Sequence, residues 1–166
     1  MPTPLFPGRF QPFHNGHLLV IQGMAKTMGN PIVVICDPLK PQPEGDDLFT
    51  LEERREMISA ALLSADIMDA TIVTAKDAGN DADWVDYVLD AAEKRQDVVM
   101  WSGREEVRAA FEAKGIATKK IVPVPGIEGE MLRSQMREGN GEWRKKVPAG
   151  ALDVIEEALV RKGISQ

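Results

Sequence analysis

The stretch Gly8-Arg9-Phe10-Gln11-Pro12-Phe13-His14-Asn15-Gly16-His17 decides the fold, because it joins a short apolar run to an amphipathic segment. Leu5-Phe6 predicts a strand before it, and the apolar spacing of residues 18–28 predicts a helix after it. In a doubly wound sheet, the turn after the first strand is where the sheet opens toward a ligand. A helix that begins there offers unpaired backbone N–H groups and the positive end of its dipole. The stretch therefore predicts an anion-binding turn.

Both histidines of the chain lie in this stretch, at His14 and His17. A spacing of three residues would place both imidazoles on one side of the first helical turn. Gly16 between them leaves room for a phosphate, and Arg9 adds a fixed positive charge with a planar set of donors. These groups favour a pocket for a polyphosphate. The alternative is that the two histidines cap a helix and do nothing more.

Other phosphate and metal sites are disfavoured. The Gly-Lys-Ser/Thr of a Walker A loop is absent, and so is the Gly-x-Gly-x-x-Gly of a dinucleotide-binding turn. A zinc site would need more ligands than two histidines and the single cysteine, Cys36, supply. We therefore expect no metal bound by protein side chains alone.

Apolar runs alternate with helical patterns along the rest of the chain. Further strands are predicted at 32–36, 70–75, 98–101 and 121–124, and the longest loop at 37–48. This alternation predicts an α/β fold: a single Rossmann-like, doubly wound parallel sheet of about five strands, with helices on both faces and a C-terminal helical segment. The apolar stripes of the later helices fall within 57–62, 85–92, 107–111, 131–138 and 152–159.

Composition bounds the class of protein. The 166 residues carry 20 Lys and Arg against 26 Asp and Glu, a net charge of −6 with neutral histidines. This length predicts one domain over 1–166 with a core of its own. The acidic balance disfavours a nucleic-acid binder, which usually has a pI above about 9.

Compartment is predicted from the same counts. A single cysteine permits no intrachain disulfide and favours a cytoplasmic location. No apolar run approaches the ~20 residues that span a bilayer. Residues 1–4 lack the features of a signal peptide, so we expect no membrane partner.

The histidine stretch resembles the signature Gly-Arg-Phe-Gln-Pro-Phe-His-x-Gly-His of the nucleotidylyltransferase superfamily. It is most similar to the archaeal-type nicotinamide mononucleotide adenylyltransferases, and the resemblance spans nearly the whole chain. The other matching segments are Phe49-Thr50-Leu51-Glu52-Glu53-Arg54, Asp83-Trp84-Val85, Trp101-Ser102-Gly103 and Arg133-Ser134-Gln135-Met136-Arg137.

The resemblance implies an enzyme that transfers AMP from ATP to the phosphate of nicotinamide or nicotinate mononucleotide, with Mg²⁺. The products would be NAD or deamido-NAD and pyrophosphate. By matching position, the catalytic residues would be His14, His17, Arg9 and Arg137. The ATP-binding residues would be Gly8, Arg9, Phe10, His14, Gly16, His17, Arg54, Ser134 and Arg137.

The resemblance also implies acceptor contacts, at Trp84 and Asp81. An indole face under a cationic pyridinium ring contributes roughly 0.5–2 kcal/mol. The alternatives are that Trp84 packs in the core and that Asp81 and Asp83 cap their helix. For the arginines, Arg54 could lie on a solvated helix face, and Arg137 could be one of several surface cations.

Departures from the family pattern keep other functions open. The loop after the second strand lacks a Gly-Ser-rich segment, and Lys40 could replace its phosphate contact. The pattern Ile-Ser-Gly-Thr has become Met131-Leu132-Arg133-Ser134, which removes a hydroxyl and adds Arg133. Glu52 stands in place of glycine, and Asp81 in place of asparagine.

Three alternatives follow from these departures. The chain could use another phosphorylated acceptor, it could use CTP as donor, or it could be a nucleotide-binding sensor without turnover. A homo-oligomer is also possible.

Overall fold

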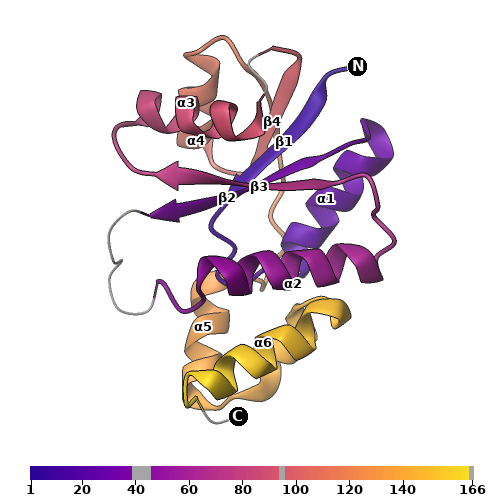
Figure 1. Cartoon of the computed structure of the whole chain (residues 1–166), viewed down its shortest axis with the longest axis vertical. Coiled ribbons are helices and arrows are strands. Elements are labelled where there is room, and N and C mark those ends of the chain that lie inside the picture. The colour runs from indigo at the N-terminus through magenta and orange to yellow at the C-terminus, as the bar shows by residue number, and fades with distance from the viewer. Residues whose placement is uncertain (39–45, 94–95, 165–166) are drawn as a thin grey trace. The chain divides into compact units, whose positions relative to one another are not determined.

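The structure, a computed structural model, describes residues 1–38, 46–93 and 96–164 (Figure 1). The chain divides into two compact units. The sheet unit comprises Met1–Arg9, Val20–Lys40 and Asp69–Pro123, and the helical unit comprises Phe10–Leu19, Pro41–Met68 and Val124–Gln166. The single domain expected over 1–166 stays a prediction. The elements are β1 (Thr3–Gly8), α1 (Asn15–Thr27), β2 (Ile32–Pro38), α2 (Leu51–Ser64), β3 (Thr71–Asp77), α3 (Asp81–Ala92), β4 (Val98–Ser102), α4 (Glu105–Glu112), β5 (Ala117–Lys120), α5 (Gly129–Glu138), the 3₁₀ helix η1 (Gly141–Lys146) and α6 (Ala149–Arg161).

The sheet unit is built on one parallel five-stranded sheet with the order β3-β2-β1-β4-β5. The chain starts at the centre with β1, adds β2 and β3 on one side, and then crosses to add β4 and β5 on the other. Strand order therefore reverses between β1 and β4, the place where such sheets bind ligands at the carboxyl ends of their strands. The predicted doubly wound, Rossmann-like fold is confirmed.

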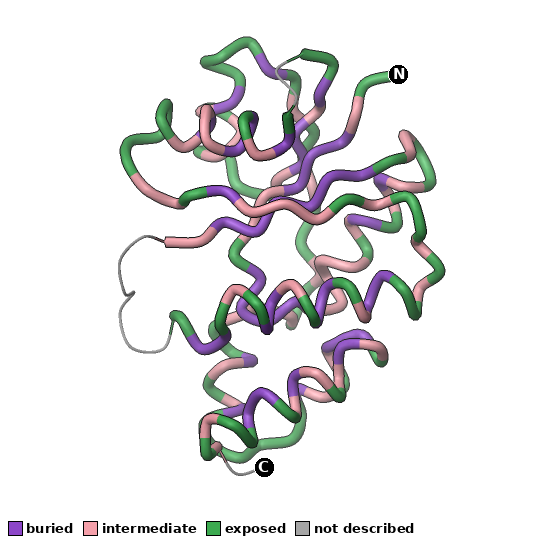
Figure 2. Tube along the Cα trace, viewed as in Figure 1, coloured by how far each residue is buried: buried purple, intermediate pink, exposed green. Residues whose placement is uncertain are grey.

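Helices cover both faces of the sheet. On one face, α3 and α4 pack against alternate strand residues such as Leu5, Val34 and Met100 (Figure 1). On the other, α1 approaches β4 so closely that a Cβ added at Gly23 would lie 3.7 Å from the Trp101 ring. The strands at the centre are accordingly the most buried part of this unit (Figure 2).

The fifth strand was predicted in the wrong place. It spans Ala117–Lys120, where it pairs with β4, and not the apolar run 121–124. Pro123 in that run has no N–H to donate to a ladder. β5 is an edge strand, and edge strands often carry charged side chains that discourage further pairing. Lys119 is such a residue, with its ammonium 4.8 Å from the centre of the Trp101 ring.

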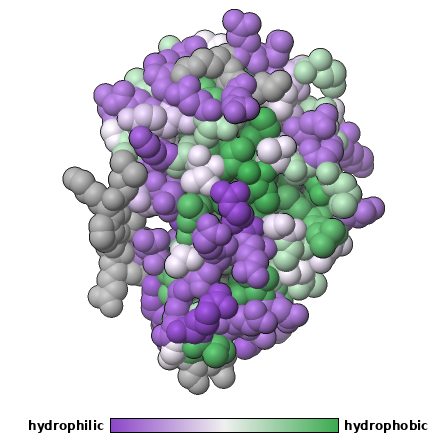
Figure 3. All heavy atoms as spheres, in the orientation of Figure 1, coloured by the Kyte–Doolittle hydropathy of each residue, from purple (hydrophilic) through white to green (hydrophobic). Residues whose placement is uncertain are grey.

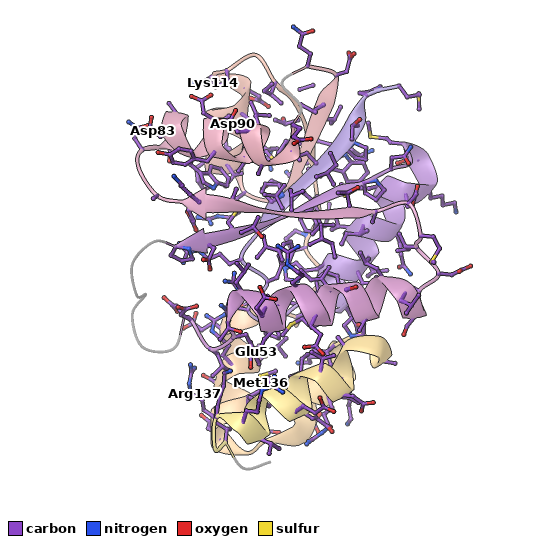
Figure 4. All side chains as sticks on the ribbon, viewed as in Figure 1. Glu53, Asp83, Asp90, Lys114, Met136 and Arg137 are labelled. Carbon is purple, nitrogen blue, oxygen red and sulfur yellow. The ribbon has the colours of Figure 1, made fainter. Side chains whose placement is uncertain are left out.

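The helical unit is organised around a capping box at the start of α2. The Glu53 N–H donates to Thr50 Oγ1 at 3.1 Å, and the Thr50 N–H donates to Glu53 Oε1 at 2.9 Å. The Glu53 carboxylate also accepts from Arg161 at 3.1 Å and from Lys162, which tie it to the end of α6 (Figure 4). Desolvation raises the pKa of Glu53, but the hydrogen bonds from Lys162, Thr50 and Arg161 outweigh it and hold the pKa below its ordinary value.

The other end of α6 packs on the last turns of α2 through a glycine. A Cβ built at Gly150 would lie 2.5 Å from the carbonyl oxygen of Ala60 and even closer to the Ser64 hydroxyl. The glycine is therefore required by the close approach of the two helices.

Among the described residues, no helix has both the length and the apolar character needed to cross a bilayer. Leu63, Met68 and Val160 are exposed, and Figure 3 shows hydrophobic residues lying among hydrophilic ones on one face.

Two glycine-to-alanine substitutions should change stability in opposite directions. We expect Gly150→Ala to lower the free energy of unfolding by about 1–3 kcal/mol, because the new methyl group overlaps backbone of α2. Gly23→Ala, also in a helix, meets only an ordinary contact and should raise it by about 0.5–1 kcal/mol. Urea unfolding followed by circular dichroism measures both. Equal effects of the two substitutions would show that the α2–α6 contact is looser than described.

Candidate active site

The two histidines form a reciprocal pair at the start of α1. The backbone N–H of His14 donates to Nδ1 of His17 at 3.1 Å, and the backbone N–H of His17 donates to Nδ1 of His14 at 3.3 Å. The rings stack with centroids 3.6 Å apart and planes 14° apart. Because each Nδ1 accepts a hydrogen bond, the hydrogen-bond network assigns the proton of each neutral ring to Nε2.

Gly16 makes this pair possible. A Cβ at position 16 would lie 2.9 Å from Cε1 and 3.0 Å from Nδ1 of His14. The space that a side chain at position 16 would take is occupied by the ring of His14. The predicted contact of Gly16 with a phosphate stays a prediction. The spacing His-x-Gly-His is therefore a requirement of the histidine pair itself.

Aromatic side chains enclose His17. Phe13 stacks on its ring at 5.5 Å between centroids, and Phe10 meets it edge-on at 4.8 Å. Phe10 has a φ of 55°, a left-handed conformation that is uncommon for a residue with a side chain. This backbone turn aims the Phe10 ring at His17.

Burial keeps both imidazoles neutral. Desolvation lowers the pKa of His14 from 6.5 to about 4, and the interaction of the ring with the backbone of His14 itself offsets this only in part. Desolvation also holds the pKa of His17 well below 6.5, and the neighbouring His14 lowers it further. Near pH 7 both rings are therefore neutral, and each carries its proton on Nε2.

Gln11 is a residue whose role sequence reasoning missed, although it lies in the quoted stretch. Its buried side chain donates to the Phe49 carbonyl at 2.8 Å and accepts from the Phe49 N–H at 2.7 Å. It also donates to Asp47 at 3.0 Å. The side chain pairs with backbone as a neighbouring strand would. It therefore connects residues 10–17, which we call the histidine loop, to the segment that leads into α2.

The arginines of the helical unit occupy different environments. Arg54 is buried, with Nε 3.3 Å from the Thr50 carbonyl, so the interpretation of a solvated helix face is wrong for this residue. Ser134 and Arg137 are exposed on α5, and Figure 4 labels Arg137 there. Arg133 is less buried than Arg54 and more buried than Arg137, and it donates to the Gln11 carbonyl at 2.8 Å.

The remaining predicted site residues belong to the sheet unit. Gly8 ends β1, and Arg9 after it pairs with Asp77 at the end of β3, with Nε 2.7 Å from Oδ2. Both lie at the carboxyl ends of strands. The structure thus assigns Gly8 and Arg9 to one unit and the histidine pair to the other.

The two predicted acceptor contacts lie on α3. Trp84 is partly buried and meets Phe111 edge-on at 5.5 Å, so it contributes to the core, as the alternative held. Asp81 is exposed in the first turn. The cap of α3 is Asn80, whose side chain accepts from the Asp83 N–H at 2.8 Å, so the prediction that Asp81 and Asp83 cap this helix is wrong.

The structure also places the single cysteine and the side chains of the types that bind metal ions. Burial raises the pKa of the Cys36 thiol to about 12, which keeps it protonated. No group of three or more His, Cys, Asp or Glu side chains within residues 1–38, 46–93 and 96–164 is placed to hold a metal ion. Lys40 lies outside the described residues.

Known proteins resemble this chain over most of its length. The cytidylyltransferase-like family matches residues 5–135. A nicotinamide-nucleotide adenylyltransferase from Methanolobus tindarius is 31% identical over 159 residues, 95% of this chain and 89% of the relative. One from Methanococcus aeolicus is 33% identical over 155 residues, 92% of this chain and 87% of the relative. The resemblance found in the sequence is confirmed.

A solved structure shares the fold. The bifunctional NMN adenylyltransferase/ADP ribose pyrophosphatase from Francisella tularensis, complexed with AMP and a manganese ion, superposes with a TM-score of 0.80 at 20% identity. The match covers 96% of this chain and 50% of that one, so the chain spans about half the length of the solved protein.

The protonation of the histidine pair is open to a direct test. Because the chain has only two histidines, an NMR titration should show two sets of imidazole signals. Near pH 7 both sets should be those of the neutral Nε2–H tautomer, and the signals of His14 should titrate near pH 4. The unfolded state takes up protons near pH 6.5 while the folded state does not. The free energy of unfolding should therefore fall as the pH is lowered from about 6.5 toward 4. A His14 pKa above 6 would contradict the reciprocal pair.

Proposed function

The chain belongs to the cytidylyltransferase-like family, and we propose that it transfers AMP from ATP to nicotinamide or nicotinate mononucleotide, forming NAD or deamido-NAD and pyrophosphate. The observation that carries the proposal is the His14–His17 pair at the start of α1, which presents two neutral donors at a helix N-terminus. Relatives with the adenylyltransferase name match more than nine-tenths of the chain. Anion binding at such a terminus is physically favourable.

The chemistry needs alignment and charge stabilisation more than it needs a base. A phosphate monoester has a second pKa of about 6, so the acceptor is already mainly a dianion near pH 7. One of its oxygens attacks the α-phosphorus of ATP, the bond from that phosphorus to the bridging oxygen breaks, and pyrophosphate leaves with the electron pair. Such in-line transfer depends on positioning and on donors aimed at the developing charge.

In this proposal His14 and His17 donate from Nε2 to oxygens of the triphosphate. Because they are neutral, they stabilise charge by directed hydrogen bonds, and the arginines supply the positive charge. Arg137 and Ser134 hold the β- and γ-phosphates from α5, which their exposure permits. Arg9 assists.

The wider ATP site has supporting members as well. Gly8 ends the central strand and Arg9 follows it, at the carboxyl edge of the sheet, where ligands of such folds bind. Phe10 and Gly16 act by shaping the histidine pair. Arg54 is buried and contributes positive potential from the first turn of α2.

Mg²⁺ would accompany ATP and would not occupy a protein cage. The described residues supply no cluster of ligands, which fits an ion that keeps most of its waters and binds phosphate oxygens. When bound, the ion neutralises triphosphate charge. Trp84 and Asp81 are the proposed acceptor contacts, supported by their place at the start of α3. A cytoplasmic location and a homo-oligomer stay predictions.

The function is tested by pyrophosphate release with ATP and Mg²⁺ against a panel of acceptors. We expect release with nicotinamide or nicotinate mononucleotide, and none with phosphopantetheine or flavin mononucleotide. A parallel series with CTP tests the donor. Release with another acceptor or with CTP would replace the proposed substrates, and ATP binding without any release would favour a nucleotide sensor.

The histidine pair should matter for turnover and not for folding. We expect His14→Ala to lower kcat by about 10²–10³-fold, the usual loss when one donor to a transition-state oxyanion is removed. Asn15→Ala is the matched control on the same turn, because its side chain makes only a long hydrogen bond of 3.4 Å to the Lys145 carbonyl. Circular dichroism should show both variants folded. If His14→Ala kept full turnover, the pair would be structural.

A further inference from the structure

We propose that Arg133 is a positioning residue, which holds the phosphate-binding helix α5 in register with the histidine loop. This inference rests on the proposed function for the meaning of that register, but the contacts that carry it do not depend on any substrate. Arg133 stands where the family pattern has glycine, so the role would belong to this chain and not to the family as a whole.

The side chain of Arg133 connects two segments far apart in sequence. Its Nη1 donates to the Gln11 carbonyl at 2.8 Å, across 122 residues, and its Nη2 lies 3.4 Å from Asp46 Oδ1. The side chain is only 12% exposed, while the Asp46 side chain is 48% exposed. The guanidinium is therefore committed to the loop backbone and is not a solvated surface charge.

The first residue of α5 is shaped for this contact. A Cβ at Gly129 would lie 3.0 Å from Arg133 Nη1 and 3.4 Å from the Gln11 oxygen. The guanidinium thus passes over a glycine one helical turn before it. Desolvation lowers the pKa of Arg133, Asp46 raises it, and the like charge of Arg137 lowers it. Arg133 and Arg137 are like charges four residues apart on α5, so a bound anion would offset their repulsion.

Gln11 extends the connection to a third segment. Its carbonyl receives Arg133 while its side chain pairs with the N–H and carbonyl of Phe49, directly before the capping box of α2. One residue of the loop thereby joins α5 to the start of α2. His14 follows Gln11 by three residues, so a shift of Gln11 shifts the histidine pair relative to Ser134 and Arg137.

The position that loses a hydroxyl supports the same conclusion. Leu132, which replaces the serine of the family pattern, is fully buried, so it offers no phosphate contact. Helix α5 exposes Ser134 and Arg137 to solvent. With fewer direct contacts from this segment, correct placement of those two residues depends more on how α5 is fixed to the loop.

The test compares Arg133→Met with Arg133→Lys, Gly129→Ala and a control, Arg144→Met. Arg144 pairs with Glu156 at 2.8 Å in the same unit. We expect Arg133→Met to lower kcat by about 10–100-fold with a smaller change in the KM of the acceptor, because misalignment of about 1 Å costs that order. Arg133→Lys keeps a donor and should recover most of kcat. Gly129→Ala keeps the charge but crowds the guanidinium, and should lower kcat in a folded protein.

The imidazole NMR spectra give a readout that does not need turnover. Arg133→Met and Gly129→Ala should shift the His14 and His17 signals, and Arg144→Met should leave them unchanged. Unchanged signals and unchanged kcat in Arg133→Met would overturn the proposal, as would equal losses in Arg133→Met and Arg144→Met. If the wild-type chain turned over none of the acceptors, the proposed function would fail, while the NMR spectra would still decide the role of Arg133.

Discussion

The reciprocal hydrogen bonds between His14 and His17 are the constraint on which the rest of the site depends. They fix both ring orientations, and they assign the proton of each ring to Nε2. They require glycine at position 16, because any Cβ there would meet the ring of His14. A short motif that could serve only to cap a helix is thereby turned into a rigid pair of hydrogen-bond donors.

Electrostatics in this site are divided between two kinds of donor. The histidines are buried deeply enough to stay neutral at pH 7, so they direct hydrogen bonds without adding charge. Arginines carry the charge, and they differ in how strongly the protein holds them. Arg54 is buried and Arg133 donates to the backbone carbonyl of Gln11, whereas Arg137 is exposed. Nucleotidyl transfer suits this arrangement because the acceptor phosphate is its own nucleophile.

The strand order of the sheet determines where the carboxyl ends of the strands can bind a ligand. Beginning at the centre and adding strands to both sides creates the reversal between β1 and β4, and it places Gly8 at the carboxyl end of the central strand. The sequence signal for this sheet was strong because β2 is an apolar, β-branched run and because β1 and β4 carry buried apolar residues. The fifth strand was misplaced because an edge strand is polar, and the neighbouring apolar run 121–124, with Val122 exposed, carried the misleading signal.

The sequence by itself determined the α/β class, the number of strands and the loop that carries the histidines, because periodicity and short motifs are local properties of the chain. Only the tertiary structure decided that Gly16 serves the ring of His14, that Arg54 is buried, that Asn80 caps α3 and that Arg133 reaches Gln11. Burial and long-range hydrogen bonds depend on which segments meet in space. Gln11 and Arg133 are 122 positions apart, and no local sequence pattern predicts that they are in contact.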